Sequence, residues 1–279
     1  MEKIKIITDS TADLNLYLIN RYKIEVLPLS VHFGEDSYRD GLDIKLHGLL
    51  MRIKEGKIFP GTTQINPQTF YECFKSYLDE GYKIVYISIS SKMSGTFQSA
   101  CIAKGMLETE DIAIIDSLNV TSGLGVLVIK ASKLIERGLG LTEIEEEINR
   151  DIPHVKSAIA FDSLENLVKG GRLSKTAGVI GGIFGIKPIL TIANGEMVVI
   201  GKVRGSKKSI RYIMDYVESK GIKKDELSIL LHIENKDILN DLRINLSARN
   251  AEFVECEAGC VVGAHAGPGA CGVFFIENY

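Results

Sequence analysis

The first half of this sequence alternates between short β-rich runs and helical patterns. Each of three apolar, β-branched runs is followed by an amphipathic stretch, and the pairs are residues 5–9 and 13–22, 83–90 and 96–107, and 112–117 and 121–138. This alternation predicts a parallel sheet with helices on its faces, because parallel neighbours need a long crossover connection and a helix supplies it. An irregular, turn-rich insertion near residues 33–60 interrupts the rhythm.

The pattern changes at Pro153, and a chain of 279 residues exceeds what one hydrophobic core usually serves. We therefore expect an α/β protein of two domains, a parallel α/β/α domain over residues 1–153 and an α+β domain with a mixed sheet over residues 154–279. The predicted elements of the second domain are a strand at 156–161, helices across 163–184, a hairpin turning at Asn194-Gly195, a helix from Ser206, and closing strands at 252–257, 261–265 and 272–276.

Charge and hydropathy argue against several classes of protein. Lys and Arg number 33 and Asp and Glu 36, so the net charge of −3 gives no reason to expect nucleic-acid binding. The most apolar stretch, residues 177–193, is interrupted by Lys187 and Pro188 and falls short of the ~20 residues of a membrane span, so we expect transient membrane contact at most. The absence of a signal-peptide core at the start and the odd number of cysteines, five, favour a cytoplasmic protein with reduced thiols.

Hydroxyl- and glycine-rich loops recur along the chain, with the sequences TDST, GTTQ, MSGT, GGRLS and HAGPG. Loops at the carboxyl ends of parallel strands meet helix N-termini, whose free N–H groups attract anions. Thr62, Thr63 and Ser94 offer hydroxyl groups at helix entrances, and Gly95 lets a ligand approach the backbone closely. Ordinary helix capping explains each loop equally well when it is taken alone.

Two candidate donors come from the second half of the chain, Arg172 in GGRLS and His265 in HAGPG. Since ligand sites often lie between domains, both could reach an anion held by the loops of the first half. A surface ion pair is the alternative for the arginine, and a satisfied structural residue is the alternative for the histidine.

Nucleotide-binding motifs fail on inspection. Gly267, Gly269 and Gly272 spell GxGxxG, but a dinucleotide site needs a helix and a second strand after them, and this chain ends seven residues later. In GGRLSKT, Ser174 precedes Lys175, whereas a phosphate-binding loop requires Gly-Lys-Ser/Thr. We expect no bound cofactor.

Metal and hydrolase motifs fail as well. The spacing of Cys256, Cys260, His265 and Cys271 matches no familiar zinc pattern, and packed free thiols explain these cysteines better. Ser94 lacks the GxSxG turn of a hydrolase nucleophile, and no catalytic partners can be assigned to it.

Taken together, the segments resemble the DegV family of bacterial fatty-acid-binding proteins over nearly the whole chain. The segments that carry the resemblance are TDSTADL from Thr8, VLPLSVHFGEDSYRDG from Val26, TTQINP from Thr62, SISSKMSGTFQSA from Ser88, AIIDS from Ala113, LVKGGRLSKTAG from Leu167, KPIL from Lys187 and HAGPGACG from His265. The resemblance implies a non-catalytic carrier that holds one long-chain fatty acid in an apolar tunnel. It also implies a partner, a fatty acid kinase that phosphorylates the bound acid for phospholipid synthesis.

The resemblance also implies roles for individual residues. Thr62, Thr63, Ser94 and Gly95 would hold the carboxylate, and Arg172 and His265 would lie where the phosphoryl group arrives. Arg204, Lys207 and Lys208, within a basic cluster, would be a candidate contact for the kinase. Ile180, Ile183 and Phe184, in the apolar run, are candidates for lining the tail, with plain helix packing as the alternative.

The chain departs from the family pattern at two places. The family often has Thr-Ser-Gln-Pro where this chain has Thr63-Gln64-Ile65 after Thr62. It often has His-Thr-Gly-Pro-Gly where this chain has Ala266, so a hydroxyl is lost at the second place. Two other functions stay open. One is an enzyme acting on a small acyl or keto substrate and related to dihydroxyacetone kinase subunits, and the other is a lipid-responsive regulator.

Overall fold

The N-terminal half forms a four-stranded parallel sheet, as the alternation predicts. The structure is a computed structural model that describes residues 2–56, 58–174 and 185–279. The strand order is β2-β1-β6-β7, and all neighbouring strands are parallel. The strands are β1 (Ile4–Asp9), β2 (Glu25–Leu27), β6 (Lys83–Ser88) and β7 (Ile112–Asp116).

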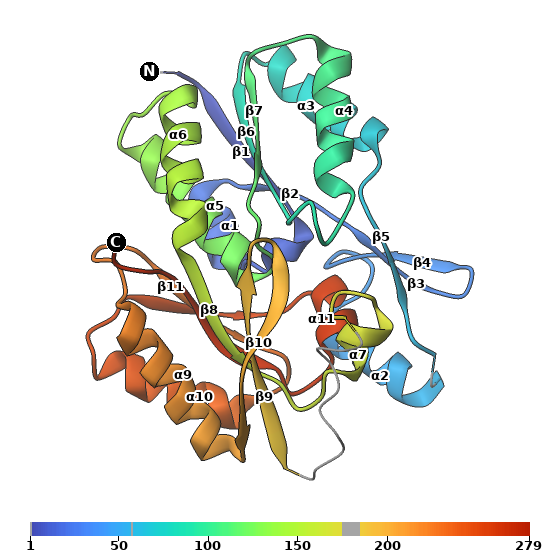
Figure 1. The fold of residues 1–279 in the computed structure, drawn as a ribbon. Coiled ribbons are helices and arrows are strands. Elements are labelled where there is room, and N and C mark those ends of the chain that lie inside the picture. The colour runs from blue at the N-terminus through green and yellow to red at the C-terminus, as the bar shows by residue number, and fades with distance from the viewer. Residues whose placement is uncertain (1, 57, 175–184) are drawn as a thin grey trace.

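Helices cover both faces of this sheet. Figure 1 shows α3 and α4 on one face and α5 and α6 on the other. The helices of this half are η1 (Ser10–Ala12), α1 (Leu16–Tyr22), α3 (Pro67–Asp79), α4 (Thr96–Leu107), α5 (Ser122–Glu136) and α6 (Leu141–Asp151). The predicted α/β/α arrangement is therefore confirmed.

A second, mixed sheet of six strands follows the short helix η2 (Ile152–His154) in the order β10-β9-β8-β13-β11-β12. Among the strand pairs that the structure describes in this sheet, only β11–β12 is parallel. The predicted hairpin is present, and Asn194 and Gly195 take the positive φ angles of 50° and 84° that its tight turn requires. The strands are β8 (Val155–Ala160), β9 (Ile186–Ala193), β10 (Glu196–Arg204), β11 (Ser228–His232), β12 (Phe253–Glu257) and β13 (Cys271–Ile276).

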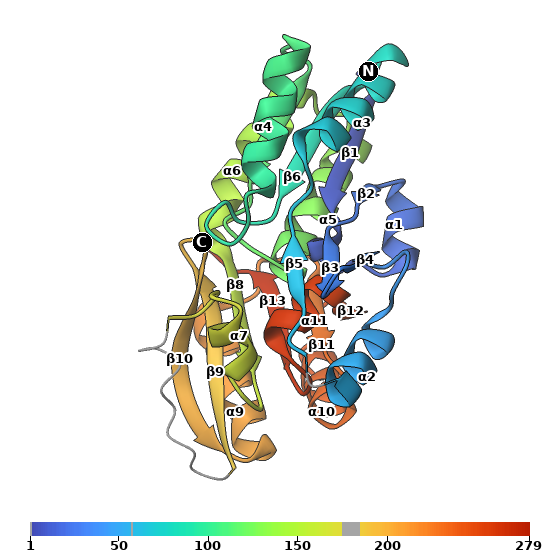
Figure 2. The ribbon, with the colours of Figure 1, turned by 90° about the vertical axis from the view of Figure 1, so that its right-hand side faces the viewer.

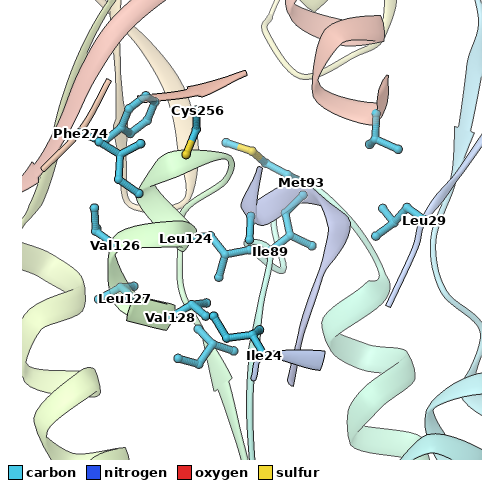
Figure 3. Packing of buried hydrophobic residues seen from close by; sticks show 14 of the residues in the cluster. Ile24, Leu29, Ile89, Met93, Leu124, Val126, Leu127, Val128, Cys256 and Phe274 are labelled. Carbon is cyan, nitrogen blue, oxygen red and sulfur yellow. The ribbon is translucent and has the colours of Figure 1, made fainter. Parts of the chain in front are cut away.

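Alternate residues of the second sheet face two different layers. Val273 and Phe275 pack with the buried side of α9 (Ser206–Lys220) and α10 (Lys236–Ser247), whereas Phe274 packs toward α5. Helix α5 contacts strands of both sheets, and twelve of its fifteen residues are buried. Figure 3 shows side chains of this shared core, among them Leu124 and Val128. The division of the chain into domains at residue 153 stays a prediction, because one core joins the two sheets.

The insertion is more regular than the sequence suggests. Residues 33–39 were expected to be irregular, but β3 (Ser30–Phe33) and β4 (Asp36–Arg39) form a hairpin, and β5 (Gly61–Thr63) pairs with the other edge of β3. Gly34 has a φ of 64° within the two-residue turn, and it is this residue that permits the reversal. Helix α2 (Leu46–Gly56) connects β4 to β5.

The strand predicted at residues 261–265 is wrong, because this segment lies in helix α11 (Cys260–Ala266). The adjacent Val261 and Val262 favour a strand locally. Carboxylates from distant parts of the chain bind the N–H groups at the start of this segment, and Gly267, with a φ of 72°, ends the helix. Tertiary contacts therefore override local propensity here. Of the helices expected across 163–184, the described residues contain α7 (Glu165–Lys169), and residues 175–184 lie outside the described part of the chain.

Candidate functional site

A cavity of about 160 Å³ lies between the two sheets. Most of its wall is apolar, and Leu29, Ile89 and Met93 are among the buried side chains drawn in Figure 3. Strands of the second sheet contribute Ile159, Ile192 and other apolar residues. The polar lining residues are Thr11, Thr62, Thr63, Gln64, Ser94, Thr121, Arg172 and His265. An apolar cavity with a few polar groups suits a ligand that is mostly hydrocarbon.

All six residues predicted for the anionic head group line this one cavity, although they come from four separate segments. Figures 1 and 2 show β5, α7 and α11 side by side, and these elements bring the segments together. The roles of the six residues in binding stay predictions. The three tail-lining candidates, Ile180, Ile183 and Phe184, lie outside the described residues.

Thr62 and Thr63 do not lie at a helix entrance, as the sequence suggested. Both belong to β5, and the next helix, α3, is capped by Asn66, whose Oδ1 accepts from the N–H of Thr69 at 2.9 Å. Since neighbouring residues of a strand point to opposite faces, the two hydroxyl groups have different partners. The Thr62 Oγ1 lies 2.9 Å from the Nε2 of His265, whereas the Thr63 Oγ1 lies 2.5 Å from the Nε2 of His32.

Ser94 and Gly95 precede α4, and the serine hydroxyl lies 2.8 Å from the hydroxyl of Thr96. A Cβ atom at position 95 would come within 2.0 Å of the Gln64 Oε1, so Gly95 lets the Gln64 amide lie against the backbone at this point. Gln64 in turn donates from Nε2 to the Ser99 Oγ at 2.9 Å. The loop after β6 and the strand β5 are thus packed together at the polar part of the cavity.

Gln64, Thr11 and Thr121 line the cavity but were not predicted as site residues. Gln64 and Thr11 lie in the hydroxyl-rich segments GTTQ and TDST, so their position in these segments could have indicated that they belong to the site. Thr121 has a φ of 52°, which is unusual for a β-branched residue and invisible in the sequence.

Arg172 connects the two halves of the chain at the cavity. Its Nε and Nη2 donate to the backbone oxygen of Met93 at 3.2 and 3.1 Å, and its Nη1 donates to the backbone oxygen of Gly170 at 2.6 Å. Within the described residues no carboxylate lies within ion-pair distance of its guanidinium, so the surface ion pair that was the alternative is not seen there. A fixed positive charge without an acidic partner favours an anionic ligand.

His265 lies in the last turn of α11 and is half-buried. Burial and the positive charge of Arg172 lower its pKa to about 4, so the ring is neutral at pH 7. Its Nε2 faces Thr62, while its Nδ1 is buried without a hydrogen-bond partner among the described residues. A Cβ atom at position 170 would come within 2.1 Å of this Nδ1, so Gly170 leaves room for the ring.

We expect His265 to make stability depend on pH between about 4 and 6.5. As the pH falls through this range, the unfolded chain takes up a proton that the folded chain excludes, because the folded pKa lies below the ordinary value of 6.5. The contribution of the neutral His265 ring to stability is therefore fully present above pH 6.5, the pKa of the ring in the unfolded chain, and is lost as the pH falls toward 4. The free energy of unfolding is measured in urea at about pH 4.5 and at about pH 7.5. Its drop between the higher and the lower pH should be about 2 kcal/mol smaller in His265→Gln than in the unchanged protein. The exposed His47, changed to Gln, serves as control, and an unchanged difference in His265→Gln would contradict the assignment.

The cysteines are free thiols in the structure. Among the described residues, no group of three or more His, Cys, Asp or Glu side chains is placed to hold a metal ion. Cys256, Cys260 and Cys271 are buried free thiols, and burial raises the pKa of each to about 12. Within the same part of the chain, no helix has the length and apolar character needed to cross a bilayer.

The chain is similar to known proteins along its whole length. Residues 3–278 match the DegV family, described as an uncharacterised protein family. A DegV domain-containing protein of Clostridium acetobutylicum is 57% identical over 279 residues, with 100% of both chains covered. A DegV domain-containing protein of Caldanaerobacter subterraneus is 43% identical over 281 residues, also with 100% of both chains covered.

Solved structures share the fold. A DegV family protein of Thermus thermophilus, described by its fatty acid binding, aligns with a TM-score of 0.90 and 29% identity, covering 99% of this chain and 100% of that one. DegV of Bacillus subtilis, described as a fatty acid binding protein, aligns with a TM-score of 0.88 and 29% identity, covering 100% of both chains. These similarities confirm the α/β fold predicted from the sequence.

Proposed function

This chain belongs to the DegV family, and from that premise we propose that it binds one long-chain fatty acid and presents the carboxylate to a separate fatty acid kinase. The observation that carries the proposal is the cavity, which has a mostly apolar wall and a polar part containing hydroxyl groups, an arginine and a neutral histidine. The fatty-acid-binding proteins of Thermus thermophilus and Bacillus subtilis, which have the same fold, support it.

The acyl chain supplies most of the binding free energy. Burying one methylene contributes roughly 0.8 kcal/mol, so about 14 methylenes contribute on the order of 11 kcal/mol before the entropy losses of binding. Leu29, Ile89 and Met93 of the first half and Ile159 and Ile192 of the second half provide the apolar surface. The ligand thereby joins the two halves of the chain.

The carboxylate is held at the polar part of the cavity. A buried carboxylate needs several donors, because burying an unpaired charge is prohibitive. The hydroxyls of Thr62 and Ser94 and the backbone N–H of Gly95 provide neutral donors, and Arg172 provides the positive charge. Thr63 lines the same polar part, and its hydroxyl must leave His32 to donate to the carboxylate as well. The neutral ring of His265, beside Thr62, completes the set next to the oxygen that receives the phosphoryl group.

A basic surface at the start of α9 is the proposed contact for the kinase. Arg204 ends β10, and Lys207 and Lys208 lie exposed in the first turn of α9. Positive side chains at a helix N-terminus are unfavourable for the helix itself, because that end carries a positive dipole. A role in binding an acidic partner explains their position better than helix stability does. The carrier itself has no catalytic residue in this proposal.

Mass spectrometry of the purified, denatured protein tests the proposal. We expect one long-chain fatty acid per chain, and we expect delipidated protein to take up one equivalent of oleate or palmitate. Absence of lipid in the purified protein together with no uptake in vitro contradicts it. Turnover of a small acyl or keto substrate by the purified chain alone, abolished in Ser94→Ala or His265→Ala, would instead favour the enzyme alternative.

A further inference from the structure

Two buried carboxylates hold the N-terminus of α11. The Asp13 Oδ1 accepts from the backbone N–H of Gly259 at 2.7 Å. The Asp40 Oδ1 accepts from the N–H of Cys260 at 2.6 Å, and its Oδ2 accepts from the N–H of Val261 at 3.3 Å. The N–H groups of the N-cap residue and of the first two residues of α11 therefore bind carboxylates that come from more than 200 residues earlier in the chain. We call Asp13, Asp40 and Gly259 the clasp.

The three residues of the clasp are closely packed and buried. A Cβ atom at position 259 would lie 2.9 Å from the Asp40 Oδ2 and 3.0 Å from the Asp13 Oδ1. Both carboxylates therefore lie close to the same glycine and leave little room for a larger residue. The side chains are 3% and 5% exposed for Asp40 and Asp13. Burial raises the pKa of both, and the neighbouring Asp40 adds to the rise at Asp13. Two carboxylates in such a place are unfavourable for stability alone, and their donors come mainly from α11.

The clasp also fixes a second wall of the cavity. The Thr121 hydroxyl donates to the Asp13 Oδ2 at 2.5 Å, and Thr121 keeps a φ of 52° that is costly for a β-branched residue. Asp13 itself has a φ of 50°. Thr121 and the α11 residues Val261 and His265 all line the cavity, so one carboxylate connects two of its walls.

Helix α11 has only seven residues, so the position of its first turn sets the position of its last. His265 lies one turn after Val261, whose N–H binds Asp40. The Nε2 of His265 lies 2.9 Å from the Thr62 Oγ1 on β5. At the C-terminal end of α11 the His265 ring packs closely against Gly170, because a Cβ atom at position 170 would lie 2.1 Å from the Nδ1 of the ring. A small shift of α11 therefore separates His265 from Thr62.

We propose that Asp13 and Asp40 are positioning residues, which hold α11 so that His265 and Thr62 meet at the head-group end of the cavity. The proposal rests on the proposed function for the identity of the ligand, a fatty acid carboxylate. The clasp residues do not touch that ligand, because neither Asp13 nor Asp40 lines the cavity. They act through α11 and through Thr121.

The test follows the ring of His265 and the affinity for a fatty acid in the full chain. The variants are Asp40→Asn, Asp13→Asn and Gly259→Ala, the last of which keeps both carboxylates and pushes the helix away from them. Asp36→Asn is the matched control, because Asp36 is an exposed aspartate on the strand that precedes Asp40. Histidine ring signals are measured by NMR in the ligand-free protein, where only five histidines contribute. Oleate affinity is measured by displacement of a fluorescent fatty acid.

We expect each clasp variant to shift the His265 ring signals and raise its pKa toward the ordinary value, while the control leaves both unchanged. The Kd for oleate should rise about tenfold, as for the loss of one hydrogen bond to a charged group. Unchanged ring signals in Gly259→Ala and Asp40→Asn overturn the proposal, and so does a weaker affinity that appears without any change at His265. If one variant fails to fold, the other two decide.

The two arms separate this proposal from the proposed function. The ring signals are read without ligand, so they report on the clasp even if the chain binds no fatty acid. Failure of oleate binding in the unchanged protein counts against the proposed function alone.

Discussion

Replacement of Arg172 by Met should weaken fatty acid binding about 30-fold or more. Among the lining residues that the structure describes, the guanidinium is the fixed positive charge, and removal of one partner of a charged pair costs about 2 kcal/mol or more. The same side chain holds the backbone of Met93 and Gly170, so its loss also loosens the junction of the two halves. Titration of delipidated protein with oleate measures the effect.

Two matched variants separate charge from geometry at this position. Arg172→Lys keeps the charge but loses the planar fork, and an intermediate affinity is expected. Arg211→Gln removes an exposed arginine of α9, away from the cavity lining, and should leave oleate affinity unchanged. An Arg172→Met protein that folds normally and binds oleate as tightly as the unchanged protein would refute the role of Arg172.

Replacement of Lys130 by Ala should lower the free energy of unfolding by about 3 to 5 kcal/mol, the usual cost of breaking a buried ion pair. Lys130 lies on α5, between the two sheets, and its Nζ contacts the carboxylates of Asp151 and Glu226. Burial acts to raise the pKa of Asp151, but hydrogen bonds from Lys130 and Tyr279 outweigh it, and the net pKa is lowered. Without the lysine, a buried carboxylate loses its main partner.

Urea unfolding at pH 7 measures this effect, with Lys75→Ala as control. Lys75 also contacts a carboxylate, that of Asp79, but both side chains are exposed, and such a pair contributes less than about 1 kcal/mol. Equal destabilisation by the two changes would show that burial of the Lys130 network is unimportant. The comparison therefore tests burial, with the residue type held constant.

The helix α5 explains why the site depends on the whole chain. It packs against both sheets, so the cavity between them has one continuous apolar support. Gly125 allows this packing, because a Cβ atom there would lie 2.9 Å from the backbone oxygen of Ala12. The segment that follows Ala12 contains Asp13, and the clasp is thereby tied to the shared core.

Much of the site could be predicted without coordinates, because hydroxyl and glycine residues at loop positions are visible in the sequence. Ser94 and Gly95 lie at the start of α4 as expected, and Arg172 and His265 join them in one cavity. Thr62 and Thr63 were placed in the right loop but on the wrong kind of element, since β5 is short and its pairing with β3 is set by the distant hairpin. Gln64 was not predicted as a site residue, because a single glutamine side chain forms no recognisable sequence motif.

The sequence by itself determined what depends on local periodicity and local conformation. The alternation of apolar runs and helical patterns determined the parallel sheet, the apolar face of α9 determined its burial, and Asn194-Gly195 determined the hairpin. Only the tertiary structure decided α11, the clasp and the partner of His265. The physical reason is that a seven-residue helix containing two adjacent valines is not stable alone, and the carboxylates that stabilise its first turn lie 246 and 220 residues away from the groups they bind.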